Sequence, residues 1–233
     1  MKKQGFYASY IKRGLDIFCA ALAIIVFWWL YVYIAILVKF KLGSPVIFSQ
    51  ERLGKNNKPF MLYKFRSMTN ATDANGKLLS DNERITKFGS ILRSTSLDEL
   101  PEVFNILKGD MSIIGPRPLP TRYLEYYTKE ELRRHNLRPG LSGYAQVEGR
   151  SFITWEEKFA MDIKYTEQCS FIFDLKIIIK TAKKMIMRRD VADFSKIEKD
   201  ENGLFWIEVE GVRKPIHRPL DVERKYMTVD TSI

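Results

Sequence analysis

Two adjacent carboxylates, Asp98 and Glu99, are the residues of this sequence best suited to chemistry. A helical pattern of apolar residues begins just after them, so the unpaired N–H groups of a helix start should lie beside both acids. Arg93 precedes the pair, and Lys64 and Arg117 lie in the segments before and after it. Helix-start N–H groups and cations together bind phosphate oxygens. A carboxylate placed there could attack phosphorus, and the resulting aspartyl phosphate would be stabilised.

The same segment also has a purely structural interpretation. Residues 96–99 (Ser-Leu-Asp-Glu) match a capping box, in which the acids of a first turn only stabilise the end of a helix. Each nearby cation could likewise be solvated or paired with a carboxylate. The gathering of several cations around the acids favours the chemical interpretation, but the residues alone leave both open.

Composition limits the other kinds of chemistry. Lysine and arginine number 38 against 28 acidic residues, and the net charge of +10 predicts anionic partners such as phosphorylated substrates, acidic lipid or nucleic acid. The two cysteines, Cys19 and Cys169, form no disulfide or zinc pattern, in keeping with a reducing cytoplasmic face. His135 and His217 are the only histidines, which is too few for a histidine metal site or Ser-His-Asp chemistry. Carboxylates must therefore act as acid, base or nucleophile.

A long apolar segment near the N-terminus predicts a membrane-embedded helix. Residues 17–38 contain no charged side chain and exceed the ~18 apolar residues that mark such a helix. The run is too long for a signal-peptide core, and Lys39 and Lys41 follow it. Basic residues flank the run on both sides, so the positive-inside rule places both ends in the cytoplasm and favours a re-entrant helix. A single membrane span is the alternative, and length alone favours it.

Four residues are predicted to anchor this helix. Arg13 and Asp16 are spaced i, i+3 and should form an ion pair at the membrane boundary. Trp28 and Trp29 lie in the middle of the run rather than at an interface, which favours something other than a straight span.

A second segment, around residues 175–189, predicts an interfacial amphipathic helix. Apolar and basic residues alternate at helical spacing, so that each kind gathers on its own side. The apolar set is Leu175, Ile178, Ile179, Ala182, Met185 and Ile186, and the basic set is Lys176, Lys180, Lys183, Lys184, Arg188 and Arg189. Such a helix could lie in an anionic lipid surface or dock on a protein core with a solvated charged face. The long apolar run elsewhere in the chain favours lipid.

The pattern between these segments predicts a mostly helical α+β fold. Residues 46–48 and 60–63 are strand-like and flank a polar turn, which predicts a small β-hairpin. Residues 69–82 should form a loop, and a helix should begin close to Asp98 with Pro101 in its first turn.

The length of 233 residues allows one catalytic unit with appendages. The predicted parts are a membrane-associated helix over residues 1–42, a catalytic domain over residues 43–190, and a C-terminal extension over residues 191–233. In this extension a hairpin is expected from residue 204 and a loose tail from residue 226, with no function assigned.

Several motifs resemble one family in unbroken order. They are Lys12, Arg13 and Asp16 before the apolar run, Lys-Phe-Arg-Ser-Met at 64–68, Leu-Asp-Glu-Leu-Pro at 97–101, Gly-Asp-Met-Ser at 109–112, Gly-Pro-Arg-Pro at 115–118 and Arg-Pro-Gly-Leu-Ser-Gly at 138–143. Over roughly residues 10–190 the chain resembles the bacterial sugar transferase family, the monotopic polyprenyl-phosphate phosphoglycosyl transferases of the small single-domain type.

The resemblance implies a re-entrant helix in the bacterial inner membrane and a Mg²⁺-dependent active site on the cytoplasmic face. It implies that Asp98 attacks a UDP-sugar and releases UMP, and that undecaprenyl phosphate then takes the phospho-sugar in a ping-pong reaction. This would be the first membrane step of glycoconjugate or polysaccharide assembly. Glu99 would help to hold the metal with Asp98 or would assist proton transfer. Membrane lipid is an implied partner, nucleic acid is not, and a homodimer is allowed.

By the same resemblance, Lys64, Arg93 and Arg117 match phosphate-contacting positions of the family. Nucleotide or sugar contacts are expected, by analogy, around Arg138, Gln146 and Arg150. Glu148 stands where many relatives have Asn, which leaves the sugar preference open. Small members of the family usually carry a Ser-Pro pair that breaks the membrane helix, and this chain has Trp28 and Trp29 there, so the simplest cause of a re-entrant turn is missing.

Two other classes of protein remain as alternatives. A non-catalytic, membrane-anchored basic binding protein would explain the charge and the anchor, but it has no need of an Asp-Glu pair among arginines. A single-span transferase with hydrolytic or nucleotidyl chemistry would transfer its group directly and would leave no phospho-sugar on Asp98.

Overall fold

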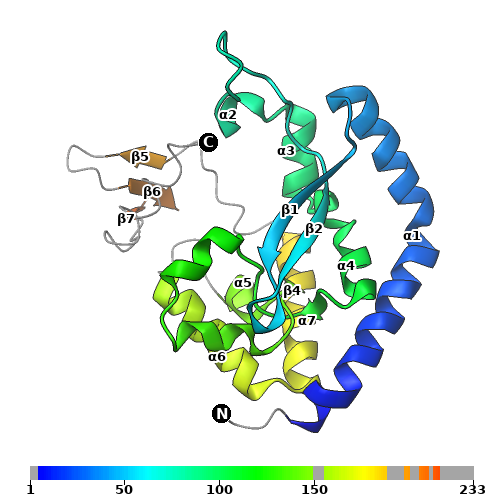
Figure 1. The fold of residues 1–233 in the computed structure, drawn as a ribbon, viewed down its shortest axis with the longest axis vertical. Coiled ribbons are helices and arrows are strands. Elements are labelled where there is room, and N and C mark those ends of the chain that lie inside the picture. Colours follow the sequence, from blue (N-terminus) through cyan, green and yellow to red (C-terminus); the bar gives the residue numbers. More distant parts are fainter. Residues whose placement is uncertain (1–4, 149–154, 188–196, 200–204, 210–211, 216–233) are drawn as a thin grey trace.

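The computed structural model describes residues 5–148, 155–187, 197–199, 205–209 and 212–215 (Figure 1). The helices are α1 (Lys12–Leu42), α2 (Asp81–Arg84), α3 (Lys87–Ser94), α4 (Glu102–Lys108), α5 (Tyr144–Glu148), α6 (Trp155–Gln168) and α7 (Phe171–Met187). The strands are β1 (Ile47–Leu53), β2 (Pro59–Phe65), β3 (Ser112–Ile114), β4 (Gly140–Ser142), β5 (Ile197–Lys199), β6 (Phe205–Val209) and β7 (Val212–Pro215). Short π or 3-10 turns are η1 (Tyr7–Ile11), η2 (Lys55–Asn57), η3 (Leu97–Glu99), η4 (Thr121–Tyr126) and η5 (Glu131–Asn136).

Helix α1 is uninterrupted and lies along one side of the molecule (Figure 1). Together with η1 it makes a 36-residue segment, Tyr7–Leu42, that is long and apolar enough to cross a membrane, with a mean hydropathy of 2.5 over an 18-residue window. The predicted long apolar helix is therefore confirmed. It has no break at Trp28 and Trp29.

Only one face of α1 packs on the rest of the protein. Ala20, Ile34, Val38 and Leu42 are buried on that face. The large apolar side chains of the other faces are exposed: Phe18, Leu22, Ile25, Val26, Phe27, Trp28, Trp29, Val32, Tyr33, Ile36 and Phe40. An exposed apolar surface of this extent is typical of a membrane or partner contact.

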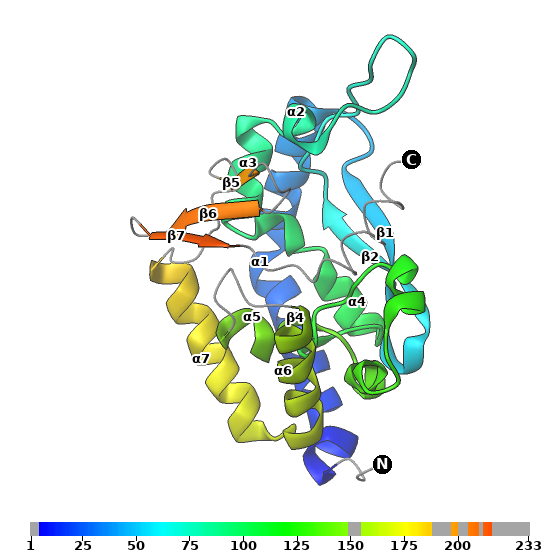
Figure 2. The ribbon, with the colours of Figure 1, turned by 90° about the vertical axis from the view of Figure 1, so that its left-hand side faces the viewer.

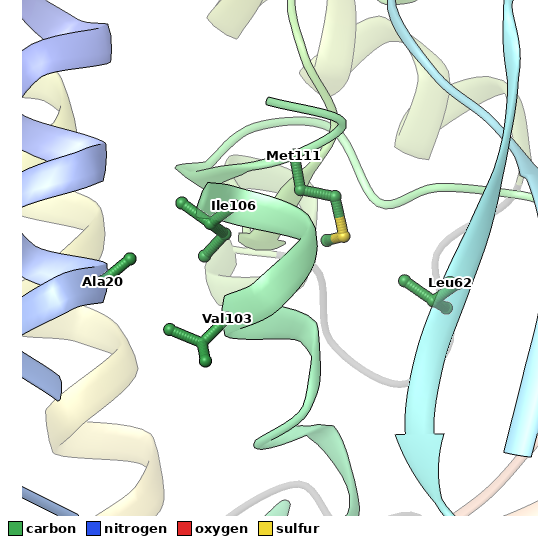
Figure 3. Packing of buried hydrophobic residues seen from close by; sticks show 5 residues of the cluster. All are labelled: Ala20, Leu62, Val103, Ile106 and Met111. Carbon is green, nitrogen blue, oxygen red and sulfur yellow. The ribbon is translucent and has the colours of Figure 1, made fainter. Parts of the chain in front are cut away.

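Helix α4 is sandwiched between α1 and the hairpin of β1 and β2 (Figure 3). Val103 and Ile106 of α4 meet Ala20 of α1 on one side and Leu62 of β2 on the other, and Met111 closes the cluster. Burial of each large side chain contributes roughly 1.5–3 kcal/mol. This core holds the start of α4, where the acidic pair lies, at a constant distance from α1.

The hairpin was predicted correctly. Strands β1 and β2 pair antiparallel from Ile47 opposite Phe65 to Leu53 opposite Pro59. Asn56 and Asn57 in the turn have positive φ angles of 56° and 61°, a conformation that asparagine tolerates better than most residues.

The outer edge of β2 is held by a single side chain of α4. Asn105 is fully buried, and its Nδ2 donates to the carbonyl of Met61 at 2.7 Å while its Oδ1 accepts from the N–H of Tyr63 at 3.1 Å. One carboxamide thus occupies two of the backbone groups that a further strand would pair. Lys64, the next residue of β2, is thereby placed over the start of α4.

The predicted ion pair between Arg13 and Asp16 is wrong. Arg13 instead donates to the carbonyls of Ile106 and Leu107 at 2.5 and 2.9 Å, and Asp16 Oδ1 accepts from the N–H of Ile113 at 3.0 Å. The last carbonyls of α4 have no partner within their own helix, so the guanidinium of Arg13 gains hydrogen bonds there that it would not gain beside Asp16. Both residues join α1 to the segment after α4.

Helices α6 and α7 meet at one end with α5 between them (Figure 2), and near that end Tyr165 of α6 donates to Asp174 of α7 at 2.6 Å. Asp174 also binds Lys12 of α1 at 2.5 Å, which ties α7 to α1. The predicted amphipathic helix is confirmed as a helix.

Helix α7 docks on the core through Asp174 and Ile177, which are buried. The apolar side chains that we expected to face lipid or the core are exposed, among them Leu175, Ile178, Ile179 and Met185. The helix therefore docks on the core, as one alternative predicted, but through a face other than the predicted apolar one.

The smaller strands complete the fold. Strands β3 and β4 pair in parallel, and β5, β6 and β7 form an antiparallel sheet. Pairing of β6 with β7 confirms the hairpin expected from residue 204, whereas the tail from residue 226 lies outside the described residues.

Candidate active site

The acidic pair lies in η3, immediately before α4. Ser96 adopts a left-handed conformation with φ 56°, and its side chain makes no capping hydrogen bond. The capping-box interpretation is therefore wrong, because neither its Ser cap nor its geometry is present. Pro101 directly precedes the first residue of α4, as expected to within a residue.

Three cations gather around these acids from three separate segments. Lys64 Nζ of β2 lies 2.6 Å from Glu99 Oε1, and Arg117 NH2 lies 3.1 Å from the same oxygen. Arg93, at the end of α3, donates through Nε to Ser67 Oγ at 2.9 Å, and its charge acts on Asp98. The structure thus brings together the five residues that the sequence singled out.

The two acids differ in their electrostatics. Burial raises the pKa of Asp98 above its usual value, and the attraction of Lys64 and Arg93 only partly offsets it. Burial also acts on Glu99, but there the attraction of Arg117 and Lys64 and their hydrogen bonds outweigh it and lower the pKa. Asp98 therefore binds a proton more readily than an ordinary aspartate, whereas Glu99 is held in its ionised form.

A third acid, Glu102, was missed by sequence reasoning. It is 4% exposed, and its Oε1 lies 3.1 Å from Lys64 Nζ, so Lys64 bridges Glu99 and Glu102. Burial raises the pKa of Glu102 to about 7 despite Lys64, and the nearby charge of Glu99 adds to the rise. The spacing of Glu99 and Glu102, i and i+3, was the signal that could have found it.

The structure describes two of the three residues expected to contact nucleotide or sugar. Arg138 donates through Nε to the carbonyl of Gly109 at 2.8 Å, at the far end of α4 from Asp98. Gln146 Nε2 donates to the carbonyl of Leu141 at 3.4 Å, while its buried Oε1 has no partner among the described residues. Arg150 lies outside the described residues.

Gly115 and Gly140, from the motifs at 115–118 and 138–143, allow two backbone segments to pack closely. A Cβ on Gly140 would lie 2.0 Å from the backbone N of Gly115, and a Cβ on Gly115 would lie 2.3 Å from the carbonyl of Arg138. Only glycine allows the two backbones to approach this closely. The two motifs together hold the loop that carries Arg117.

The oxygen ligands of the site fit Mg²⁺. Asp98 and Glu99 offer carboxylate oxygens, and Mg²⁺ usually takes one or two carboxylates together with substrate phosphates. Lys64 and Arg117 both bind Oε1 of Glu99, so neither occupies Oε2. Among the described residues, no group of three or more acidic, histidine or cysteine side chains is placed to hold a metal ion by itself.

A buried carboxylate among cations, next to a long exposed apolar helix, is the arrangement of an enzyme that handles phosphorylated groups at a membrane. Residues 7–188 match the model of the bacterial sugar transferase family, and the chain belongs to that family. Family membership makes it a phosphoglycosyl transferase.

The relatives differ in length and in named substrate. The chain is 44% identical over 181 residues to the uncharacterized sugar transferase EpsL of Bacillus subtilis (strain 168), covering 78% of this chain and 90% of that protein. It is 38% identical over 186 residues to the UDP-N-acetylgalactosamine-undecaprenyl-phosphate N-acetylgalactosaminephosphotransferase of Aeromonas hydrophila, covering 76% and 44%. It is 37% identical over 192 residues to the UDP-glucose:undecaprenyl-phosphate glucose-1-phosphate transferase of Xanthomonas campestris pv. campestris, covering 77% and 40%. The chain thus spans less than half of the last two relatives.

Proposed function

We propose that this protein transfers a sugar-1-phosphate from a UDP-sugar to undecaprenyl phosphate, forming the diphospho-sugar and UMP by a ping-pong mechanism. The observation that carries the proposal is the burial of Asp98 at 7% exposure, directly beside Glu99 and in the field of Lys64 and Arg93. The named activities of relatives with undecaprenyl phosphate support the acceptor. Those relatives act on different sugars, so the donor sugar of this chain is to be found by experiment.

In the first half-reaction, a carboxylate oxygen of Asp98 attacks the phosphorus bonded to the sugar, and the P–O bond to UMP breaks with its electrons on UMP. In the second, a phosphate oxygen of undecaprenyl phosphate attacks the same phosphorus, and Asp98 leaves as a carboxylate. One site can bind a soluble donor and then a lipid acceptor because the phospho-sugar stays covalently attached to Asp98 between the two half-reactions.

The cations make this attack feasible. A pyrophosphate carries several negative charges that repel a carboxylate, and Lys64, Arg93 and Arg117 neutralise part of them. Glu99, ionised and held by Lys64 and Arg117, keeps two of these cations in place. When bound at Asp98 and Glu99, Mg²⁺ would supply the remaining charge neutralisation.

For the membrane arrangement we propose that both ends of α1 stay on the cytoplasmic face of the bacterial inner membrane, as in a re-entrant helix. At 31 residues α1 is about 46 Å long, so length would permit a span across the roughly 30 Å of a bilayer core. However, buried residues recur along α1 from Asp16 to Leu42, and Arg66 binds the carbonyls of Leu42 and Ser44 at its C-terminal end. A helix packed on the catalytic domain at both ends cannot cross the bilayer without taking that domain with it.

The exposed apolar side chains then become the lipid contact. Trp28 and Trp29 are 62% and 54% exposed on α1, and Ile179 and Met185 of α7 are 60% and 61% exposed. Lys176, Lys180 and Lys183 beside them suit an anionic surface. The active site would then lie where a lipid-bound acceptor can reach it, and the reaction would begin glycoconjugate assembly.

The decisive experiment incubates purified protein with Mg²⁺, undecaprenyl phosphate and a panel of UDP-sugars, and measures UMP. We expect UMP with at least one donor, a phospho-sugar on Asp98 by mass spectrometry, and no turnover after addition of EDTA. Asp98→Asn should abolish turnover, whereas Glu130→Gln, which removes a surface carboxylate, should not. Full turnover by Asp98→Asn would refute the mechanism.

The same experiment separates the alternatives. A non-catalytic binding protein would release no UMP with any donor and would bind vesicles equally well with or without Asp98→Asn. A direct-transfer enzyme would release UMP but would never carry the phospho-sugar.

A further inference from the structure

The loop that carries Arg117 is held almost entirely by its carbonyl groups. Pro116 and Pro118 flank Arg117 and have no N–H to donate, so the loop depends on partners for its carbonyls. Four successive carbonyls have such partners: Pro116 O accepts from Gly140 N–H, Arg117 O from Arg134, Pro118 O from Arg52 and Leu119 O from Leu53 N–H. The side chain of Arg117 is 50% exposed, so packing does little to hold it, and its direction depends on its backbone and on its contact with Glu99.

The carbonyl of Arg117 accepts from the buried guanidinium of Arg134, which has several other partners. Arg134 NH2 donates to Arg117 O at 2.8 Å, and the residue is only 2% exposed. Asp162 Oδ2 accepts from Nε and NH2 of Arg134 at 3.0 and 2.6 Å. The guanidinium also lies over the ring of Phe159 at 5.2 Å and donates through NH1 to Tyr127 OH at 3.1 Å.

We propose that Arg134 is a positioning residue: held by Asp162, it fixes the backbone of Arg117 so that the Arg117 side chain reaches Glu99 and the phosphates. The inference rests on the proposed function. Arg134 lies outside the motifs that mark the family in this sequence, and both residues are remote in sequence from Asp98.

The chemistry of arginine explains why this residue is used. A planar guanidinium can bind a carboxylate, a carbonyl and a hydroxyl at once, whereas lysine has a single ammonium group. Arg134→Lys would keep the charge beside Asp162 but could not hold the same set of partners. Misplacement of a catalytic group by about 1 Å can cost roughly a hundredfold in rate.

The test must separate positioning from mere stability. Replacing both partners, as Arg134→Met with Asp162→Leu, removes the buried charges together and keeps apolar volume, so the fold should persist. Under the proposal, kcat for UMP release falls about tenfold to a hundredfold in this double variant while KM for the UDP-sugar changes less. Arg134→Lys should show the same defect without removing the charge.

Two further variants serve as controls. Arg133→Gln removes the neighbouring arginine, which pairs with Glu130 and Glu167 at the surface and does not contact Arg117, and it should leave kcat unchanged. In an Arg117→Ala background, the double change should cause little additional loss, because its effect acts through Arg117.

Each outcome is informative. Wild-type kcat in both Arg134 variants, or full additivity with Arg117→Ala, overturns the inference while leaving the proposed function intact. Absence of UMP from the wild type with every donor overturns the proposed function and this inference with it. A loss of kcat that disappears in the Arg117→Ala background supports the inference.

Discussion

Removal of the Asn105 carboxamide should weaken both the fold and the site. In Asn105→Ala the N–H of Tyr63 and the carbonyl of Met61 lose the partners that lie at 3.1 and 2.7 Å. An unpaired buried backbone group costs about 1–3 kcal/mol. Both groups point at the place of the lost carboxamide on α4, so both lose their partner. The expected loss in the free energy of unfolding is therefore about 2–6 kcal/mol, a large share of the roughly 5–15 kcal/mol of a typical domain.

Asn105→Ala should also lower the rate of the reaction. With its outer edge free, β2 can shift relative to α4, and Lys64 then loses its place between Glu99 and Glu102, at 2.6 and 3.1 Å. We expect kcat for UMP release to fall even under conditions in which the variant is folded, with a smaller change in KM.

The assay is urea unfolding of detergent-solubilised protein, followed by tryptophan fluorescence, together with UMP release. Lys108→Gln is the matched control, since its side chain is 55% exposed on the same helix and its loss should cost less than about 0.5 kcal/mol. A destabilisation of Asn105→Ala no greater than that of the control would refute the view that this carboxamide completes the sheet edge.

Three other predictions follow from the structure. Because the pKa of Glu102 is raised to about 7 in the folded protein, its contribution to stability is fully present below pH about 4.5 and is lost as pH rises through about 7. Glu102→Gln should remove this component of the pH dependence, measured by urea unfolding at several pH values between about 4.5 and about 7. Ile106→Ala should lower the free energy of unfolding by about 2–5 kcal/mol, measured in the same way, because Ile106 is 1% exposed in the cluster between α1 and β2. Trp28→Ser with Trp29→Ser should weaken binding to anionic vesicles about tenfold or more without changing stability in detergent, and unchanged vesicle binding would argue against lipid contact at these positions.

Features that depend on neighbours in the chain could be predicted from the sequence. The hairpin of β1 and β2, the long apolar helix and the helix start beside Asp98 arise from side-chain periodicity and turn residues within short segments. Family resemblance added the roles of Lys64, Arg93 and Arg117, and the structure brings all three to the acids. That part of the site was accessible because its motifs are contiguous.

Contacts between side chains and groups from distant segments of the chain could not be predicted from the sequence. Arg13 was spaced for an ion pair with Asp16, but the open carbonyls at the end of α4 compete for its guanidinium, and their position depends on the tertiary fold. Arg138 likewise donates through Nε to the carbonyl of Gly109, a partner that no local pattern predicted.

The sequence by itself determined the chemistry available to this protein: an acidic pair at a helix start, cations around it and an apolar helix to hold it at a membrane. The tertiary structure alone decided that Glu102 shares Lys64 with Glu99 and that Arg134 holds Arg117. The physical reason is that a buried polar group takes whichever partner the packing of distant segments brings within reach, and no local pattern records that choice.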